Sequence, residues 1–235
     1  MNIVLIGYMG LEGPGVMHLY HFAHELVRLG HGVFVLLNGD PGSVRLMAEP
    51  PAFPVVRLEW QGGMLAPKVA GAVTGFGPQV VHAWTPRNAT AHAALEIAQR
   101  TSAEIFIHYE DDEDYLYRYA AQDLLANRSL TLESIVRPEL WAWQHPLVST
   151  TANHFARGFT AICKPYVERL QREWGKPVHL LYPGVDLERF HPSAPPLPRA
   201  RFGLEGKTVL SGYSSGAAVS SWPTAARCCS MKSAR

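Results

Sequence analysis

The sequence has few cysteines, no cluster of basic residues and no long apolar run. Its three cysteines, Cys163 and the adjacent Cys228 and Cys229, form neither a disulfide framework nor a metal-ligand spacing, which is typical of a reducing cytoplasm. The formal net charge of +1 gives no footprint for nucleic-acid binding. No apolar run reaches the roughly 18 residues that a membrane-spanning helix needs, and no basic leader segment precedes the first apolar run. We therefore predict a soluble, cytoplasmic protein, for which peripheral contact with a membrane stays open.

The proportions of apolar and charged residues are those of a globular protein. Apolar residues make up 47% and charged residues 17% of the 235 positions, so the chain can build a full hydrophobic core. A chain of this length is expected to form one or two domains.

The N-terminal segment has the pattern of a strand, a glycine-rich loop, a helix and a second strand. Residues 2–6 and 33–37 are continuous apolar runs, as expected for strands buried on both faces of a parallel sheet. Between them, apolar positions keep helical spacing over residues 16–29, and Gly30 is a typical helix end. This βαβ pattern predicts the start of a doubly wound sheet.

Strand and helix patterns continue to alternate along the chain. The sequence therefore predicts an α/β fold, with a Rossmann-like, mostly parallel sheet and helices on both faces. The further predicted strands are 55–58, 79–84, 104–108, 159–163 and 178–182, and the further predicted helices are 68–76, 88–100, 114–127, 132–144 and 166–174.

Four short segments have recurring patterns in a recognisable order. Residues 26–33 (LVRLGHGV) are similar to L-x-x-x-G-H-x-V before a second strand. Residues 78–83 (PQVVHA) are similar to P-D-V-V-H-x-H, with Trp84 in place of the final histidine. Residues 107–111 (IHYED) resemble a strand that ends in histidine and an acid, and residues 160–166 (TAICKPY) resemble a later strand and the start of its helix.

A fifth segment, residues 183–192 (PGVDLERFHP), is similar to the pattern P-(N/G)-G-V-D-x-x-x-F-x-P at a domain junction. Together the five segments resemble glycosyltransferase family 4, retaining enzymes of the GT-B fold, over about residues 1–210. The resemblance implies a Rossmann-like acceptor-side domain at residues 1–190, followed by a linker and the first strand of an incomplete second domain at residues 191–210. Residues 211–235 contain seven serines, three basic residues and no acid, which predicts a disordered tail.

The resemblance implies transfer of a sugar from a nucleotide diphosphate sugar to an acceptor, which is a sugar, a lipid or a small molecule. The donor is a substrate, and no cofactor is expected. The family binds the donor through a pair of glutamates and basic residues in its second domain, and nothing after Leu210 matches that signature. We therefore expect a truncated or frameshifted chain that is inactive alone.

Two other functions stay open. The first is a non-catalytic binding module that self-associates through the apolar face normally covered by the second domain. The second is an NAD-dependent oxidoreductase, for which Asn38 and Asp40 are the only ribose-binding candidates and the dinucleotide glycine spacing is missing.

The loop of residues 7–15 is the strongest candidate for a binding site. Its glycines let a backbone approach a phosphate at the start of the following helix. By resemblance, Gly13 and Gly15 are expected near the phosphates of the donor. Pro14 removes one backbone donor from this loop, and the acid that usually follows in the family is missing. A tight turn without a ligand is the alternative.

His108 is the candidate catalytic residue because it ends a predicted strand at the edge where α/β sheets bind ligands. His82 ends the preceding strand and is a weaker candidate for binding substrate; a core or capping role is the alternative for both histidines. Glu110 and Asp111 are candidates for binding acceptor hydroxyls. They begin a run of five acids, which is more typical of a solvated helix start than of a metal site, and we predict no bound metal.

Two other groups of residues are interpreted as structural. His18, His21 and His24 follow each other at intervals of three and are expected at the surface or its boundary, without zinc. The aromatic residues near the acidic run are expected in the core and at its rim, and a surface that stacks on a sugar or an acceptor is the alternative. They are Tyr115, Tyr117, Tyr119, Trp141 and Trp143.

Overall fold

The computed structural model describes residues 1–11, 13–47, 49–113, 115–116 and 146–184, together with residues 193, 200, 205 and 206. Contacts divide the chain into two units, Met1–Gly184 and Val185–Arg235. The fold below is that of the first unit. The predicted helices 114–127, apart from residues 115–116, and 132–144 lie outside the described residues, as does most of the predicted linker and tail.

The centre of this unit is a seven-stranded sheet with the order β3-β2-β1-β6-β7-β8-β9, and every neighbouring pair in it is parallel. This arrangement confirms the predicted α/β, Rossmann-like fold. The strands are β1 (Asn2–Gly7), β2 (Gly32–Leu37), β3 (Val55–Arg57), β6 (Val80–Trp84), β7 (Glu104–Tyr109), β8 (Gly158–Ala161) and β9 (Val178–Leu180).

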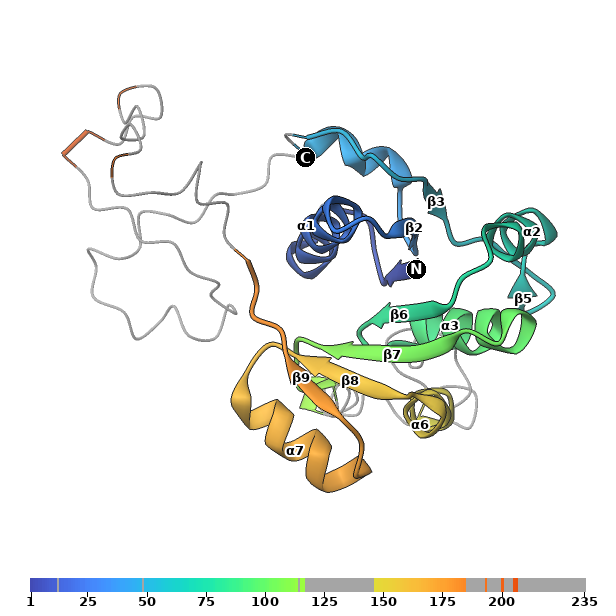
Figure 1. Cartoon of the computed structure of the whole chain (residues 1–235). Coiled ribbons are helices and arrows are strands. Elements are labelled where there is room, and N and C mark those ends of the chain that lie inside the picture. Colours follow the sequence, from blue (N-terminus) through green and yellow to red (C-terminus); the bar gives the residue numbers. More distant parts are fainter. Residues whose placement is uncertain are drawn as a thin grey trace, which may run out of the picture. The chain divides into compact units, whose positions relative to one another are not determined.

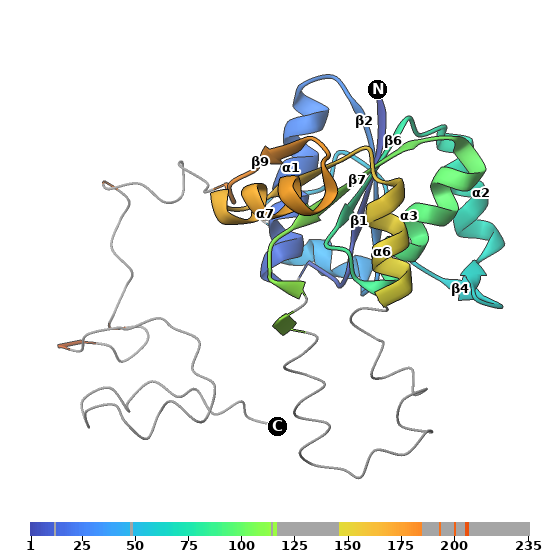
Figure 2. The same cartoon turned by 90° about the horizontal axis from the view of Figure 1, so that it is seen from below.

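Helices lie against both faces of the sheet. Figure 2 shows α1 on one side and α2, α3 and α6 on the other. The helices are α1 (Pro14–Arg28), α2 (Pro67–Phe76), α3 (Asn88–Thr101), α6 (Pro146–Phe155) and α7 (Lys164–Trp174), with a 3-10 helix at Pro41–Leu46.

Side-chain alternation along the strands produces two hydrophobic cores. Ile3 and Leu5 pack with Leu19 of α1 on one face, while Val4 and Ile6 pack with residues of α2, α3, α6 and α7 on the other. Residues one apart in a strand point to opposite faces, so continuous apolar runs are what a sheet covered on both sides requires.

The boundaries differ from the predicted ones in several places. β8 and β9 end two residues earlier than expected, at Ala161 and Leu180. Helix α7 begins two residues earlier, at Lys164, because Pro165 fits the first turn of a helix. Helix α6 and the 3-10 helix were not predicted. Neither was the hairpin of β4 (Trp60–Gln61) and β5 (Met64–Leu65), whose turn residues Gly62 and Gly63 both have positive φ.

The strand order reverses between β1 and β6, at the centre of the sheet (Figure 1). β2 and β3 follow on one side of β1, whereas β6 to β9 follow on the other. In open α/β sheets, ligands bind outside the carboxyl ends of the strands at such a reversal point. Gly7 and Trp84 are register partners there.

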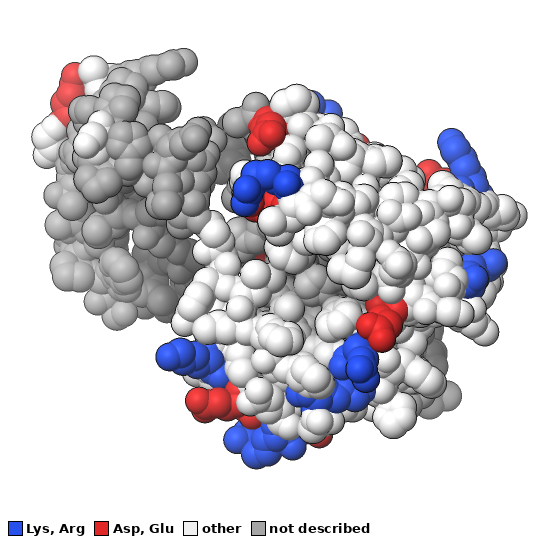
Figure 3. Space-filling model, viewed as in Figure 1, with Lys and Arg blue, Asp and Glu red and all other residues white. Residues whose placement is uncertain are grey.

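On the face shown in Figure 3, acidic and basic side chains are interspersed, and neither sign forms a large patch among the residues drawn as described. None of the described helices has the length and hydrophobicity needed to cross a membrane.

Candidate functional site

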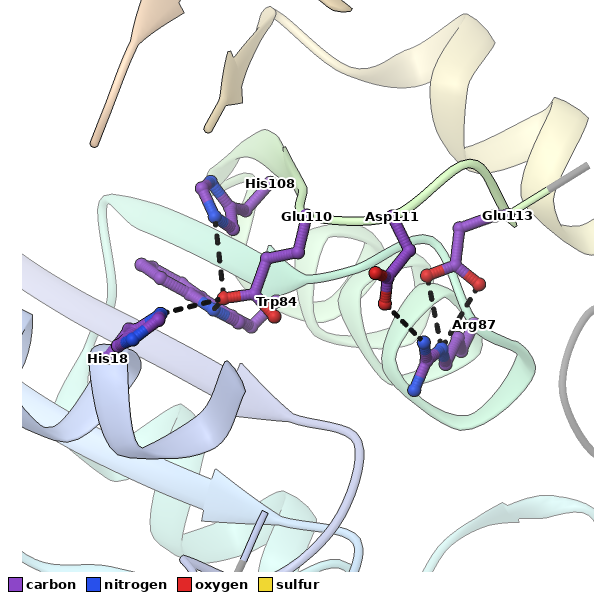
Figure 4. Close-up of polar contacts among 7 residues, drawn as sticks. All are labelled: His18, Trp84, Arg87, His108, Glu110, Asp111 and Glu113. Atoms are coloured by element: carbon purple, nitrogen blue, oxygen red, sulfur yellow. Dashed lines mark hydrogen bonds and ion pairs between the residues drawn. The ribbon is translucent and has the colours of Figure 1, made fainter. Parts of the chain in front are cut away.

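Residues from α1, β6, β7 and the loop after β7 meet at the carboxyl ends of β6 and β7. The carboxylate of Glu110, the residue after β7, is the common partner. Trp84 Nε1 donates a hydrogen bond of 3.0 Å to Glu110 Oε1, and His18 Nδ1 lies 3.4 Å from the same oxygen. His108 Nε2 is 3.8 Å from it. Figure 4 shows the three rings arranged around this oxygen.

The second oxygen of Glu110 faces the first turn of α1. A Cβ atom added to Gly15 would lie only 1.9 Å from Glu110 Oε2, so glycine at this position allows the carboxylate to approach. Glu110 is buried, with 9% of its surface exposed. The prediction that Gly13 and Gly15 lie near donor phosphates stays a prediction, and the structure places a carboxylate of the chain itself beside Gly15.

His82 and His108 are joined through Thr160 on β8. Thr160 Oγ1 lies 3.0 Å from His82 Nε2 and 2.8 Å from His108 Nδ1. A hydroxyl has one proton, so it donates to one ring and accepts from the other. We assign donation from His82 to Thr160 and from Thr160 to His108, because this leaves the N–H of His108 on Nε2, facing the Glu110 carboxylate.

Both histidines are neutral at pH 7. Burial lowers the pKa of His82 to about 4. Burial also lowers the pKa of His108 well below the usual value, and the neighbouring His82 and His18 lower it further. The ring of His108 stacks against Trp84, with centroids 4.1 Å apart and planes at 32°. A neutral, immobilised imidazole can orient a hydroxyl by donating or accepting one hydrogen bond.

The acidic segment is held by Arg87, which lies between β6 and α3. Arg87 Nε donates to both oxygens of Glu113 at 3.1 Å, and Arg87 Nη2 donates to Asp111 at 3.1 Å (Figure 4). The guanidinium also lies 3.8 Å from the centroid of the Tyr8 ring. Burial raises the pKa of Glu113, and the charge of Arg87 offsets part of that rise.

The expectation that this acidic run is a solvated helix start is therefore wrong for its first and fourth members. Glu110 and Glu113 are 9% and 2% exposed, because Trp84 and Arg87 supply hydrogen bonds that replace water. Asp111 remains half exposed. His18, which was assigned to the surface boundary, contacts Glu110.

The chain is strained where it leaves β6. Thr85 has a φ of 72°, which is unfavourable for a β-branched residue. Its amide donates to the carbonyl of His108 at 3.1 Å, and its carbonyl accepts from Thr90 Oγ1 at 2.5 Å. Such strain is concentrated at functional sites. Here the turn directs Trp84 toward Glu110 and Arg87 toward Glu113.

A cleft of about 190 Å³ opens beside these residues. Its lining combines the three side chains that surround the Glu110 carboxylate with apolar residues that follow β8 and β9. The lining includes His18, Trp84, His108, Ile162, Leu181 and Tyr182. A larger hollow of about 1050 Å³ lies at the opposite, amino-terminal ends of β7 to β9, where the sequence placed no candidate residue.

Four residues of the site were not among the sequence candidates: Trp84, Arg87, Glu113 and Thr160. The sequence marks Trp84 only as a departure from a histidine pattern, Thr160 only as part of a strand segment, and Glu113 only as a member of the acidic run. Among the described residues, no group of three His, Cys, Asp or Glu side chains is placed to hold a metal ion. Trp141, Trp143, Tyr117 and Tyr119 lie outside the described residues.

Comparison with known proteins identifies one matching family and several solved structures with a similar fold. The sequence profile of Glycosyltransferase Family 4 matches residues 15–189. A search of curated protein sequences finds no match. A variant of Os79 from O. sativa, in complex with UDP, is 10% identical with a TM-score of 0.50, over 88% of this chain and 58% of that one.

A second similar structure is Phytolacca americana UGT2 complexed with UDP-2fluoro-glucose and pterostilbene, with 12% identity and a TM-score of 0.48, over 79% of this chain and 55% of that one. The present chain thus spans a little more than half the length of these two proteins. At such low identity, the likeness concerns the fold alone.

Proposed function

Because this chain belongs to glycosyltransferase family 4, we propose that residues 1–190 form the acceptor-side domain of an enzyme that transfers a sugar from a nucleotide diphosphate sugar to an acceptor. The observation that carries this proposal is the placement of His108. It is a buried, neutral imidazole at the carboxyl end of β7, stacked on Trp84 and lining the cleft.

In this proposal, His108 and Glu110 orient one hydroxyl group of the acceptor in the cleft. The carboxylate accepts a hydrogen bond from the hydroxyl, and the Nε2–H of His108 donates to its oxygen. Neither group has to change its charge at pH 7, so the contribution is positioning of the reacting oxygen. Stabilisation of the leaving phosphate charge would come from a donor-binding domain.

The donor to test first is a uridine diphosphate sugar, since Os79, the similar fold with the higher TM-score of the two, was solved with UDP. We propose that residues 1–235 transfer little or no sugar alone, because this sequence does not contain the family's donor-binding signature. We further propose that the Val185–Arg235 unit includes the linker and first strand of that second domain.

The test uses amide and histidine NMR spectra of the 235-residue chain during titration with methyl β-glucoside, with release of UDP from UDP-glucose assayed in parallel. We expect saturable shifts of His108, Trp84 and the segment after β7, and no release of UDP. His108→Gln should remove the shifts, whereas His92→Gln, on α3 beside the opposite hollow, should keep them. Shifts confined to the His92 region would contradict the proposed site, and UDP release would contradict the proposed inactivity.

A further inference from the structure

The start of α1 is not capped by a side chain of its own first turn, and Glu12, which precedes the N-cap, lies outside the described residues. Gly13 is the N-cap and makes no side-chain hydrogen bond, and the first turn has no acidic residue. A helix start with free N–H groups attracts an anion. Among the described residues, the carboxylate that lies beside this helix start is that of Glu110, which follows β7 and faces Gly15.

The charge of Glu110 has no basic partner other than histidine among the described residues. Its side-chain contacts are with Trp84, His18 and His108, and His108 is neutral at pH 7 because burial lowers its pKa. Arg87 binds Glu113 and Asp111 instead, and Arg169 binds Asp112. The start of α1 therefore already has a carboxylate beside it that none of the described lysines or arginines neutralises.

A second negative group at this position would meet strong repulsion. Two negative charges a few ångströms apart repel each other, and burial reduces the screening of that repulsion by salt. A neutral hydroxyl meets no such penalty, because it can donate a hydrogen bond to the carboxylate.

We propose that Glu110 determines the specificity of this edge: its carboxylate occupies the anion position of α1, excludes phosphates, and admits neutral, hydroxyl-bearing groups. The inference deepens the proposed function, on which the identity of the admitted group as an acceptor depends. It also assigns the donor phosphates to a position away from Gly13 and Gly15, contrary to what the glycine loop predicts from sequence.

The experiment is a titration of the 235-residue chain with inorganic pyrophosphate at constant ionic strength, followed through the amide signals of Gly15 and Val16. The wild-type chain should show no saturable shift. Glu110→Gln preserves the shape of the side chain and removes its charge, so its affinity for pyrophosphate at these amides should rise at least about tenfold. Glu110→Ala provides a second, independent removal of the charge.

The matched control is Glu104→Gln, which removes one carboxylate from the amino end of the same strand. Glu104 is exposed and pairs with Arg157, so its replacement should leave pyrophosphate binding unchanged. Saturable binding of pyrophosphate by the wild-type chain at Gly15 and Val16 would overturn the proposal, and this outcome does not depend on any variant. Failure of both Glu110 variants to bind pyrophosphate, when their spectra show a folded chain, would overturn it as well.

The outcome is separable from that of the proposed function. Gain of pyrophosphate binding on removal of Glu110 supports charge exclusion even when methyl β-glucoside gives no shift, and in that case the acceptor role fails alone. Shifts with the glucoside together with saturable wild-type binding of pyrophosphate at Gly15 and Val16 would support the acceptor role and overturn charge exclusion.

Discussion

Thr160 Oγ1 lies 2.8 Å from Nδ1 of His108, and the same hydroxyl lies 3.0 Å from His82. The neighbouring strands β7 and β8 place His108 and Thr160 in register. One hydroxyl group therefore holds the orientation of the candidate catalytic histidine and determines which of its nitrogens carries the proton.

Replacement of Thr160 by valine keeps the shape and removes this link. We expect Thr160→Val to lower the free energy of unfolding by about 1–2 kcal/mol, because two buried ring nitrogens lose their partner. The nitrogen signals of His108 should change from one tautomer to a mixture. Thr160→Ser should restore both properties, and an unchanged tautomer in Thr160→Val would show that Thr160 does not position His108.

Stability should fall as the pH decreases from about 6.5 to about 4. The pKa of His82 is about 4 in the folded chain and near 6.5 in the unfolded chain. As the pH falls, the unfolded chain is protonated before the folded chain, and this protonation stabilises the unfolded state relative to the folded state. His82 alone should cost on the order of 3 kcal/mol over this range, and His108 acts in the same direction.

The measurement is urea unfolding at a series of pH values in wild type and His82→Gln. The difference between their free energies of unfolding should vary over the same pH range, since the variant cannot titrate there. Parallel curves for the two proteins would show that His82 is not held neutral by burial.

Arg87→Met should be among the most destabilising substitutions at the site. Arg87 and Glu113 are both buried, with side chains 6% and 3% exposed, and loss of one partner leaves the other charge unpaired. We expect a loss of about 3–5 kcal/mol in urea unfolding. The exposed pair of Arg28 and Glu25 provides the control, because Arg28→Met should hardly move the unfolding midpoint. Equal effects of the two substitutions would show that the buried pair of Arg87 and Glu113 contributes no more to stability than an exposed pair.

Two glycine-to-alanine substitutions should have opposite signs. Both positions are helical, so alanine is intrinsically favoured at each. Gly71 on α2 is exposed and has open space around it, so Gly71→Ala should stabilise the chain by about 0.5–1 kcal/mol. At Gly15 the new methyl group collides with Glu110, and Gly15→Ala should destabilise by about 1–3 kcal/mol. Thermal unfolding of both variants measures the contrast, and stabilisation at Gly15 would show that Glu110 moves away freely.

The fold could be predicted because its signals are local. The strands Asn2–Gly7 and Gly32–Leu37 are continuous apolar runs, separated by a segment of helical periodicity. Such strands have apolar side chains on both faces, and these are buried only in a sheet that helices cover on both sides. Helix α6 was missed because its sequence, PLVSTTANHF, contains β-branched and hydroxyl residues that have low helix propensity. Its place against α3 is decided by packing.

The site could be predicted only in part. His108 and Glu110 were identified because each lies at a strand end, which is a position that sequence periodicity reveals. Trp84 and Glu110 are 26 residues apart, and His18 and Glu110 are 92 apart, so no spacing rule relates them. The acidic run was expected to be solvated because its partner Arg87 lies more than 20 residues earlier in the sequence, where no local pattern relates it to the acids.

By itself, the sequence determined the order of the seven sheet strands and most of the helices, the parallel sheet, the edge at which polar residues gather and the family resemblance. These depend on the periods of neighbouring residues and on glycine and proline at turns. Only the tertiary structure decided that Glu110 faces the start of α1, that Thr160 joins His82 to His108, and that Arg87 binds the acids. Those contacts depend on strand register and on the burial of charge, and both are set when distant segments pack together.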